Sequence, residues 1–130
     1  MKKNVAHLGG IFIYSENAKA LAEWYTEQLG IPFESTDTCQ AYYTSYHYPD
    51  NETGKKHYTA FSILQSKHRP QLEFHAFCLN LRVYNLGELH ASLQSKNIAI
   101  KAIESYPEGK FSQLTDPENN LIELWEDTAV

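Results

Sequence analysis

The stretch LGGIFIYSENAKALAEWYTEQLG, residues 8–30, decides the fold because it joins a strand pattern directly to a helix pattern. Residues 8–14 are rich in β-branched and aromatic side chains, as strands are. Asn17 suits the N-cap of a helix, and Gly30 suits the left-handed residue that ends one. Between them, apolar residues recur at helical spacing: Ala18, Leu21, Ala22, Trp24, Tyr25 and Leu29. The stretch therefore predicts a strand followed by a helix with one apolar face.

The same order of elements begins again in the second half of the chain. A shift of 68 residues places Asn17 on Asn85 and Leu21 on Leu89. Each half then continues with strand-like patterns, at residues 41–48 and 57–64 in the first, and at 99–105, 109–115 and 120–127 in the second. We expect one domain, residues 1–130, with module one at about 4–65, a polar linker at about 65–72 and module two at about 73–127. Each module is predicted to be a strand, a helix and three strands.

Composition excludes several classes of partner. A net charge of −5 argues against nucleic acid and against an anionic membrane surface, which need basic residues. No apolar run is long enough to span a membrane. The two cysteines form no CxxC pair, which fits a reducing compartment. We therefore expect a cytoplasmic protein with a small-molecule ligand, no nucleic-acid partner and no membrane partner.

Both ends of the chain resemble the vicinal oxygen chelate superfamily, which includes glyoxalase, bleomycin-resistance and dioxygenase domains. Residues 8–31 resemble its opening strand and helix, which ends in FY or WY and then LG. Residues 111–127, FSQLTDPENNLIELWED, are similar to its final hairpin, with Asn119 where Gly is usual. The resemblance implies an α+β fold in which two βαβββ modules form curved mixed sheets around a cup-shaped pocket. It also implies a homodimer, or at least close packing of the two modules.

In metal-dependent relatives, four ligands come from four strands that line the cup. The resemblance places these positions at Gly10, at about Thr59, at Cys78 and at Glu123. Only Glu123 is of the expected ligand type, and Gly10 has no donor side chain. We therefore expect no metal and no cofactor, with one divalent metal ion as the alternative.

His7 and His75 occupy equivalent places in the repeat, each three residues before a ligand position. An odd shift along a strand turns a side chain to the opposite face, so we interpret both as structural or edge histidines. A β-bulge would instead make them ligands.

The alternation of side chains along strands predicts the surface of the cup. If Gly10, Cys78 and Glu123 face the cup, the more apolar alternate residues of the same strands face the helices. The residues that we expect to line the pocket are Phe12, Tyr14, Thr59, Phe61, Cys78, Asn80, Arg82 and Trp125, together with Glu123.

Arg82 and Glu123 are the two charges predicted to enter the cup. They either pair with each other, which would satisfy both groups, or serve a ligand. In the second case Arg82 would hold a carboxylate or phosphate, and Glu123 would act as a general base.

The leading hypothesis is a protein that binds a small organic molecule in an aromatic-lined cup without metal. It would either sequester the molecule, as bleomycin-resistance relatives do, or act on it through Glu123, so the sequence leaves open whether it is an enzyme. The alternative is a metal-dependent lyase, isomerase or dioxygenase with Glu123 as one ligand. A structural or regulatory module, its cup filled by an Arg82–Glu123 pair, is the third possibility.

Overall fold

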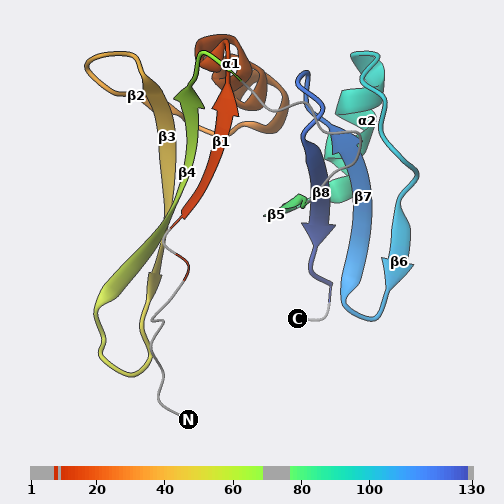
Figure 1. The fold of residues 1–130 in the computed structure, drawn as a ribbon. Helices are drawn as coiled ribbons and strands as arrows, with labels where there is room; N and C mark the ends of the chain where they lie inside the picture. The colour runs from red at the N-terminus through yellow and green to blue at the C-terminus, as the bar shows by residue number, and fades with distance from the viewer. Residues whose placement is uncertain (1–7, 9, 69–76, 129–130) are drawn as a thin grey trace. The chain divides into compact units, whose positions relative to one another are not determined.

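The computed structural model describes residues 8, 10–68 and 77–128. The chain divides into two compact units, Met1–Arg69 and Pro70–Val130, and each is described by itself. In each unit a four-stranded mixed sheet carries a helix on one face (Figure 1). Residues 69–76, which include the second half of the predicted linker and His75, lie outside the described residues, as does His7.

The first unit has the strand order β1-β4-β3-β2. β1 runs parallel to β4, and the other neighbours are antiparallel. The β3–β4 hairpin continues beyond the start of β1 (Figure 1), since only the Ala60–Gln65 part of β4 pairs with β1. Its elements are β1 (Gly10–Ser15), α1 (Ala18–Leu29), β2 (Glu34–Ser35), β3 (Ala41–Pro49) and β4 (Lys56–Gln65).

The second unit repeats this topology with the order β5-β8-β7-β6. β5 is parallel to β8, and the remaining pairs are antiparallel. Its elements are β5 (Leu79–Arg82), α2 (Leu86–Ser95), β6 (Glu104–Tyr106), β7 (Gly109–Thr115) and β8 (Leu121–Glu126). The predicted repeat of a strand, a helix and three strands, and with it the α+β fold class, is confirmed.

Both predicted helix starts are confirmed in atomic detail. The Asn17 side chain accepts a hydrogen bond from the Ala20 N–H at 3.2 Å, and Asn85 accepts one from the Glu88 N–H at 3.1 Å. A side chain at the end of a strand satisfies a further backbone N–H in the first turn of each helix. The Ala18 N–H donates to Gln65 Oε1, and the Leu86 N–H donates to Glu126 Oε1. Gln65 and Glu126 close β4 and β8, so each helix is tied to the strand beside it in its own sheet.

Each core lies between the helix and the covered face of its sheet. In the first unit Tyr25 is fully buried and meets Phe33 and Phe61 edge to face, with ring centroids 6.2 and 5.5 Å away. In the second, the fully buried side chains are Leu86, Leu93, Ile122 and Leu124. Among the described residues, no helix is long and apolar enough to cross a membrane.

The position of Phe61 corrects the sequence analysis. The prediction placed this residue in the open pocket, but it is 4% exposed and packs under α1. The β1–β4 register pairs it with Ile11, and Gly10 with Ala60. Thr59 lies two residues from Phe61 and therefore has the same strand parity, opposite to that of Ala60. Ala60, which has no donor atom in its side chain, is thus the fourth-strand neighbour of Gly10.

Candidate functional site

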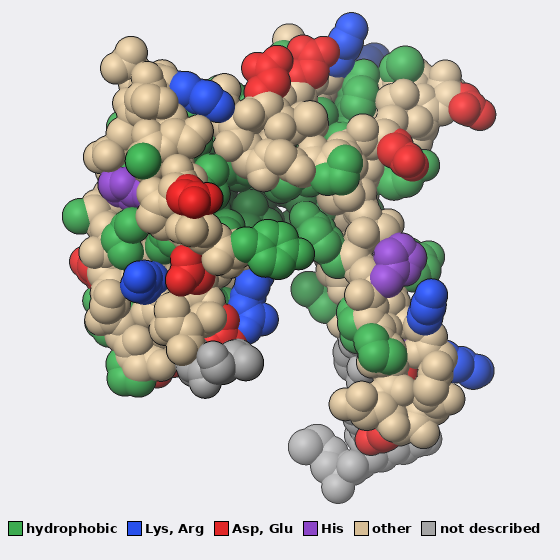
Figure 2. Space-filling model, turned by 180° about the vertical axis from the view of Figure 1, so that it is seen from behind, with side chains coloured by type: hydrophobic (Ala, Val, Ile, Leu, Met, Phe, Trp, Pro, Cys, Tyr) green, Lys and Arg blue, Asp and Glu red, His purple; other side chains and the backbone are tan. Residues whose placement is uncertain are grey.

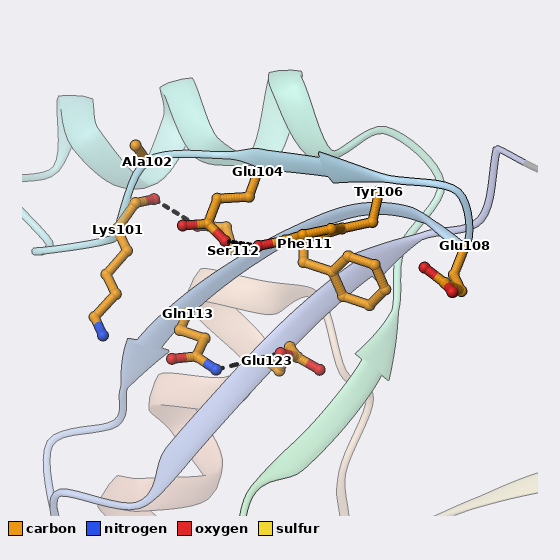
Figure 3. A pocket seen from close by; sticks show the side chains of 9 residues that line it. All are labelled: Lys101, Ala102, Glu104, Tyr106, Glu108, Phe111, Ser112, Gln113 and Glu123. Carbon is orange, nitrogen blue, oxygen red and sulfur yellow. Dashed lines mark hydrogen bonds between the residues drawn. The ribbon is translucent and has the colours of Figure 1, made fainter.

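The open face of the second sheet carries Glu123 near its centre. Asn80, Glu123 and Gln113 lie in one row across β5, β8 and β7. The Asn80 amide donates to Glu123 Oε1 at 2.9 Å. The Gln113 amide donates to Glu123 Oε2 at 3.2 Å, as Figure 3 shows. Each carboxylate oxygen is thereby oriented by an amide and keeps the capacity to accept one more hydrogen bond.

Aromatic rings form the adjacent row. Trp125 and Phe111 are paired across β8 and β7 and stack almost in parallel, with centroids 5.7 Å apart at an angle of 10°. Tyr106 meets Phe111 edge to face at 5.9 Å. The Trp125 indole N–H donates to the Glu108 carbonyl at 2.9 Å, which fixes the ring in its plane. The three rings make a rigid apolar surface beside the carboxylate row.

Between these rows and the start of β6 lies a pocket of about 400 Å³. Figure 3 shows Glu123 and Gln113 reaching toward each other on one side of it, and Tyr106 and Phe111 on another. Its lining also includes Lys101, Glu104 and Glu108, so every lining residue belongs to the second unit. Small-molecule sites commonly have this size and this mixture of rings with a few polar groups.

Arg82 does not pair with Glu123. Its guanidinium forms an ion pair with Asp127 and lies 4.4 Å from the centroid of the Trp125 ring. Stacking on Trp125 holds the guanidinium in place at the edge of the aromatic row. Of the two alternatives left open by the sequence, the Arg82–Glu123 pair is thus not formed, and the structural module that depended on it loses its support.

Cys78 lies directly before β5, close enough to Glu123 to feel its charge. Partial burial raises the pKa of its thiol, and the negative charge of Glu123 raises it further, although a hydrogen bond with the Glu123 backbone acts in the opposite direction. The thiol is exposed at the surface. Metal coordination requires loss of the thiol proton, and the raised pKa makes that loss more costly at Cys78.

The first unit holds the other residues expected in the cup. Phe12 and Tyr14 are each 52% exposed, whereas Ile13 between them is 4% exposed, so both rings lie on the face of the sheet away from α1. Figure 2 shows that hydrophobic side chains, a class that includes Tyr and is coloured green, are exposed on the face of the molecule in view. The Thr59 hydroxyl donates to the Leu8 carbonyl at 2.9 Å.

The ligand position at Gly10 is not only without a donor but also covered. A Cβ added there would lie 3.1 Å from the Phe12 ring and 2.9 Å from the Ala60 carbonyl oxygen. The four ligand positions implied by the resemblance do not supply a donor set for a divalent metal, since Gly10 and Ala60 have no donor atom in their side chains. Within residues 8, 10–68 and 77–128, no three His, Cys, Asp or Glu side chains come together as a metal site would require.

Several residues of the site were missed from the sequence: Lys101, Glu104, Tyr106, Glu108, Phe111 and Gln113. Two of these had a usable signal. The hairpin motif at residues 111–127 contains the turn at residues 116–120, and pairing outward from this turn sets Gln113 opposite Glu123 and Phe111 opposite Trp125. The β6 residues had no such anchor, because the connection from α2 runs through an isolated bridge at Ile100 before β6 begins.

Two βαβββ units, each with one covered and one open sheet face, define a protein of the glyoxalase, bleomycin-resistance and dioxygenase fold. A glyoxalase/dioxygenase from Nostoc punctiforme matches with a TM-score of 0.70 and 14% identity, over 95% of this chain and 92% of that one. TnmS3, an antibiotic-binding protein from Streptomyces sp. CB03234, matches with a TM-score of 0.65 and 18% identity, over 98% and 100%.

A lactoylglutathione lyase from Agrobacterium tumefaciens matches with a TM-score of 0.62 and 11% identity, over 95% of this chain and 96% of that one. No family model matches the sequence, and no curated protein matches it. The likeness is thus one of fold. It confirms the fold of the vicinal oxygen chelate superfamily, which the motifs at the two ends of the chain had indicated.

Proposed function

We propose that this protein binds a small planar organic molecule on the open face of its second sheet, without a metal ion. The observation that carries the proposal is that a row of polar side chains around a carboxylate lies next to a row of aromatic rings. The Glu123 carboxylate is held between two amides, and the Trp125–Phe111 stack lies directly beside it. A flat ring on the aromatic row could place a hydroxyl or amine donor against Glu123.

Aromatic stacking and a hydrogen bond to a charged group both favour binding at this place. An aromatic pair contributes about 0.5 to 1.5 kcal/mol beyond the area that it buries. A hydrogen bond to a charged group contributes about 1.5 to 3 kcal/mol. The amides of Asn80 and Gln113 hold the carboxylate in position before the ligand arrives, which lowers the cost of ordering it.

The antibiotic-binding protein TnmS3 shares the fold, which supports a ligand-binding role, and a lyase and a glyoxalase/dioxygenase share it as well, so the proposal covers binding with or without conversion. We keep the metal-free proposal because the residues at the metal positions of the fold do not fit a divalent ion. A cytoplasmic homodimer remains part of the proposal, and the mass of the native protein in solution would test the dimer.

The test uses 1-naphthylmethanol as a probe and NMR to locate its binding. The chain has two Trp residues, so the indole N–H region should contain two signals, which Trp24→Phe assigns. We expect the probe to shift the Trp125 indole signal and to leave that of Trp24, which lies on α1, in place. Glu123→Gln should weaken binding by about tenfold, as loss of a charge-assisted hydrogen bond does.

Glu52→Gln is the matched control, because it makes the same change at the exposed tip of the first unit's hairpin. It should leave the affinity for the probe unchanged. A probe that shifts neither indole signal, or one that binds Glu123→Gln as tightly as the natural chain, would overturn the proposal.

A further inference from the structure

The charges around the second-unit pocket are strongly unbalanced. Three carboxylates line it, from Glu104 on β6, Glu108 in the β6–β7 turn and Glu123 on β8, against the one ammonium of Lys101. In Figure 3 the three carboxylates lie around the Phe111 ring, and Lys101 lies at the far end of the pocket. The pocket thus surrounds an aromatic floor with negative charge.

This negative charge is not neutralised from within the unit. Among the residues that the structure describes, no Lys, Arg or His forms an ion pair with Glu104, Glu108 or Glu123. Arg82, the cation on the neighbouring strand β5, is held by Asp127 and by the Trp125 ring. The hydrogen bonds to Glu104 and Glu123 come from neutral groups, the Tyr106 hydroxyl at 2.5 Å and the two amides.

The rings add a second reason for a positively charged ligand. Aromatic faces attract cations, and a cation above the Phe111–Tyr106 floor would also lie among the carboxylates. An anionic ligand would meet three like charges and only one opposite charge. Both the rings and the carboxylates therefore select for the same sign of charge.

From this arrangement we infer that the ligand is an arylalkyl amine or another aromatic organic cation, whose ring lies on the Phe111–Tyr106 floor and whose positive charge faces Glu104, Glu108 and Glu123. This inference rests on the proposed function and makes it more specific. The pocket discriminates among flat molecules of similar size by charge.

Three probes with the same ring and different charge test the inference by isothermal titration calorimetry. These are 1-naphthylmethylammonium, 1-naphthylmethanol and 1-naphthylacetate. We expect the cation to bind about tenfold more tightly than the alcohol and the anion to bind least. Added salt should reduce the advantage of the cation, because the carboxylates are partly exposed to solvent.

Glu108→Gln tests the contribution of the carboxylates to binding. It removes one charge from the pocket, while the Glu108 backbone carbonyl keeps its hydrogen bond from Trp125. We expect it to weaken binding of the cation several-fold more than it weakens binding of the alcohol. Glu88→Gln is the control, because it makes the same change in net charge on α2, which packs on the covered face of the same sheet.

The outcomes separate the two proposals. If the alcohol binds and the cation binds no better, the charge inference fails and the proposed function stands. The charge inference also fails if Glu88→Gln weakens binding of the cation as much as Glu108→Gln does. If none of the three probes binds, both proposals fail together.

Discussion

At Gly109 the backbone φ is 136°, and an added Cβ would lie 2.2 Å from the Glu126 carbonyl oxygen and 2.8 Å from Trp125 Nε1. The missing side chain lets the start of β7 approach the end of β8 closely. That approach brings the Trp125 indole within reach of the Glu108 carbonyl. The orientation of the aromatic row therefore depends on one glycine that touches no ligand.

We expect Gly109→Ala to lower the free energy of unfolding by about 2 to 4 kcal/mol, since it adds a steric clash to a strained backbone. Gly54→Ala is the control, because Gly54 also has a positive φ, of 71°, but has nothing within 4 Å of the added Cβ. It should cost only about 1 to 2 kcal/mol. Urea denaturation of both variants gives the comparison, and equal losses would contradict the role assigned to close packing at Gly109.

The Cys78 thiol reports on the charge of Glu123. Because burial and Glu123 raise its pKa above the ordinary value of 9.0, the thiolate fraction at pH 8 should be small and alkylation slow. In a Cys39→Ser background, the rate of reaction with iodoacetamide should rise with a midpoint above pH 9.0.

Glu123→Gln removes the second cause of the raised pKa and should move this midpoint to lower pH, with faster alkylation at pH 8. Glu88→Gln, on the other side of the sheet, should leave the midpoint in place. An unchanged midpoint in Glu123→Gln would mean that the carboxylate does not act on Cys78.

At the scale of elements, a side-chain hydrogen bond between His57 and Asp50 closes the tip of the β3–β4 hairpin. His57 Nε2 and Asp50 Oδ2 are 2.8 Å apart, and the Gly54 N–H donates to the Asp50 carbonyl at 2.8 Å. The hydrogen bond from His57 lowers the pKa of the Asp50 carboxyl well below its ordinary value of 3.8, and the Glu52 backbone N–H lowers it further.

A lowered carboxyl pKa stabilises the folded hairpin at pH values above the unfolded pKa, and this contribution is lost as the pH falls through the folded pKa. We expect the Gly54 amide signal in NMR spectra to change with a midpoint below pH 3.8. Asp50→Asn should abolish that transition. A midpoint at or above pH 3.8 in the natural chain would show that His57 does not hold the carboxylate.

Elements with a local signature could be predicted from the sequence. Asn17, Gly30 and Asn85 marked the helix ends because capping depends on the adjacent backbone alone. In the same way the Asp116 carboxylate and Asn119, with φ of 66°, made the last turn recognisable. That turn contained enough information to place Gln113 as well.

Strand parity in the middle of the chain could not be predicted. No turn or motif fixes β4 against β1, so only the pairing of Gly10 with Ala60 shows that Phe61 belongs to the core. A register error of one residue exchanges the two faces of a strand. The partner of Arg82 could not be predicted for another reason, because Asp127 lies just beyond the end of β8, where alternation no longer predicts direction.

At the scale of the whole molecule, the metal-free proposal has a direct test. We expect elemental analysis of protein purified without chelators to find far less than one Zn, Fe, Mn or Ni per chain. Incubation with these ions followed by desalting should not change that result, since the side chains at the fold's metal positions do not supply a suitable donor set.

About one tightly held ion per chain would contradict this proposal. His7→Ala and His75→Ala variants would then show whether these residues, which lie outside the described part of the chain, supply the ligands. Loss of the ion in both variants would establish a histidine site and revive the metal-dependent alternative.

In both units a helix covers only one face of the sheet, and this has a consequence for how such proteins change over time. Every second residue of a strand packs in the core, and the residues between do not contribute to core packing. Substitutions on the open face can accumulate without unfolding the chain, so the ligand that is bound can change while the fold is retained. A lyase, a glyoxalase/dioxygenase and an antibiotic-binding protein that share this fold at identities of 11%, 14% and 18% show the outcome expected of such a scaffold. Libraries that vary only the open-face residues of β6, β7 and β8 would give this chain new ligands while its folding information stays intact.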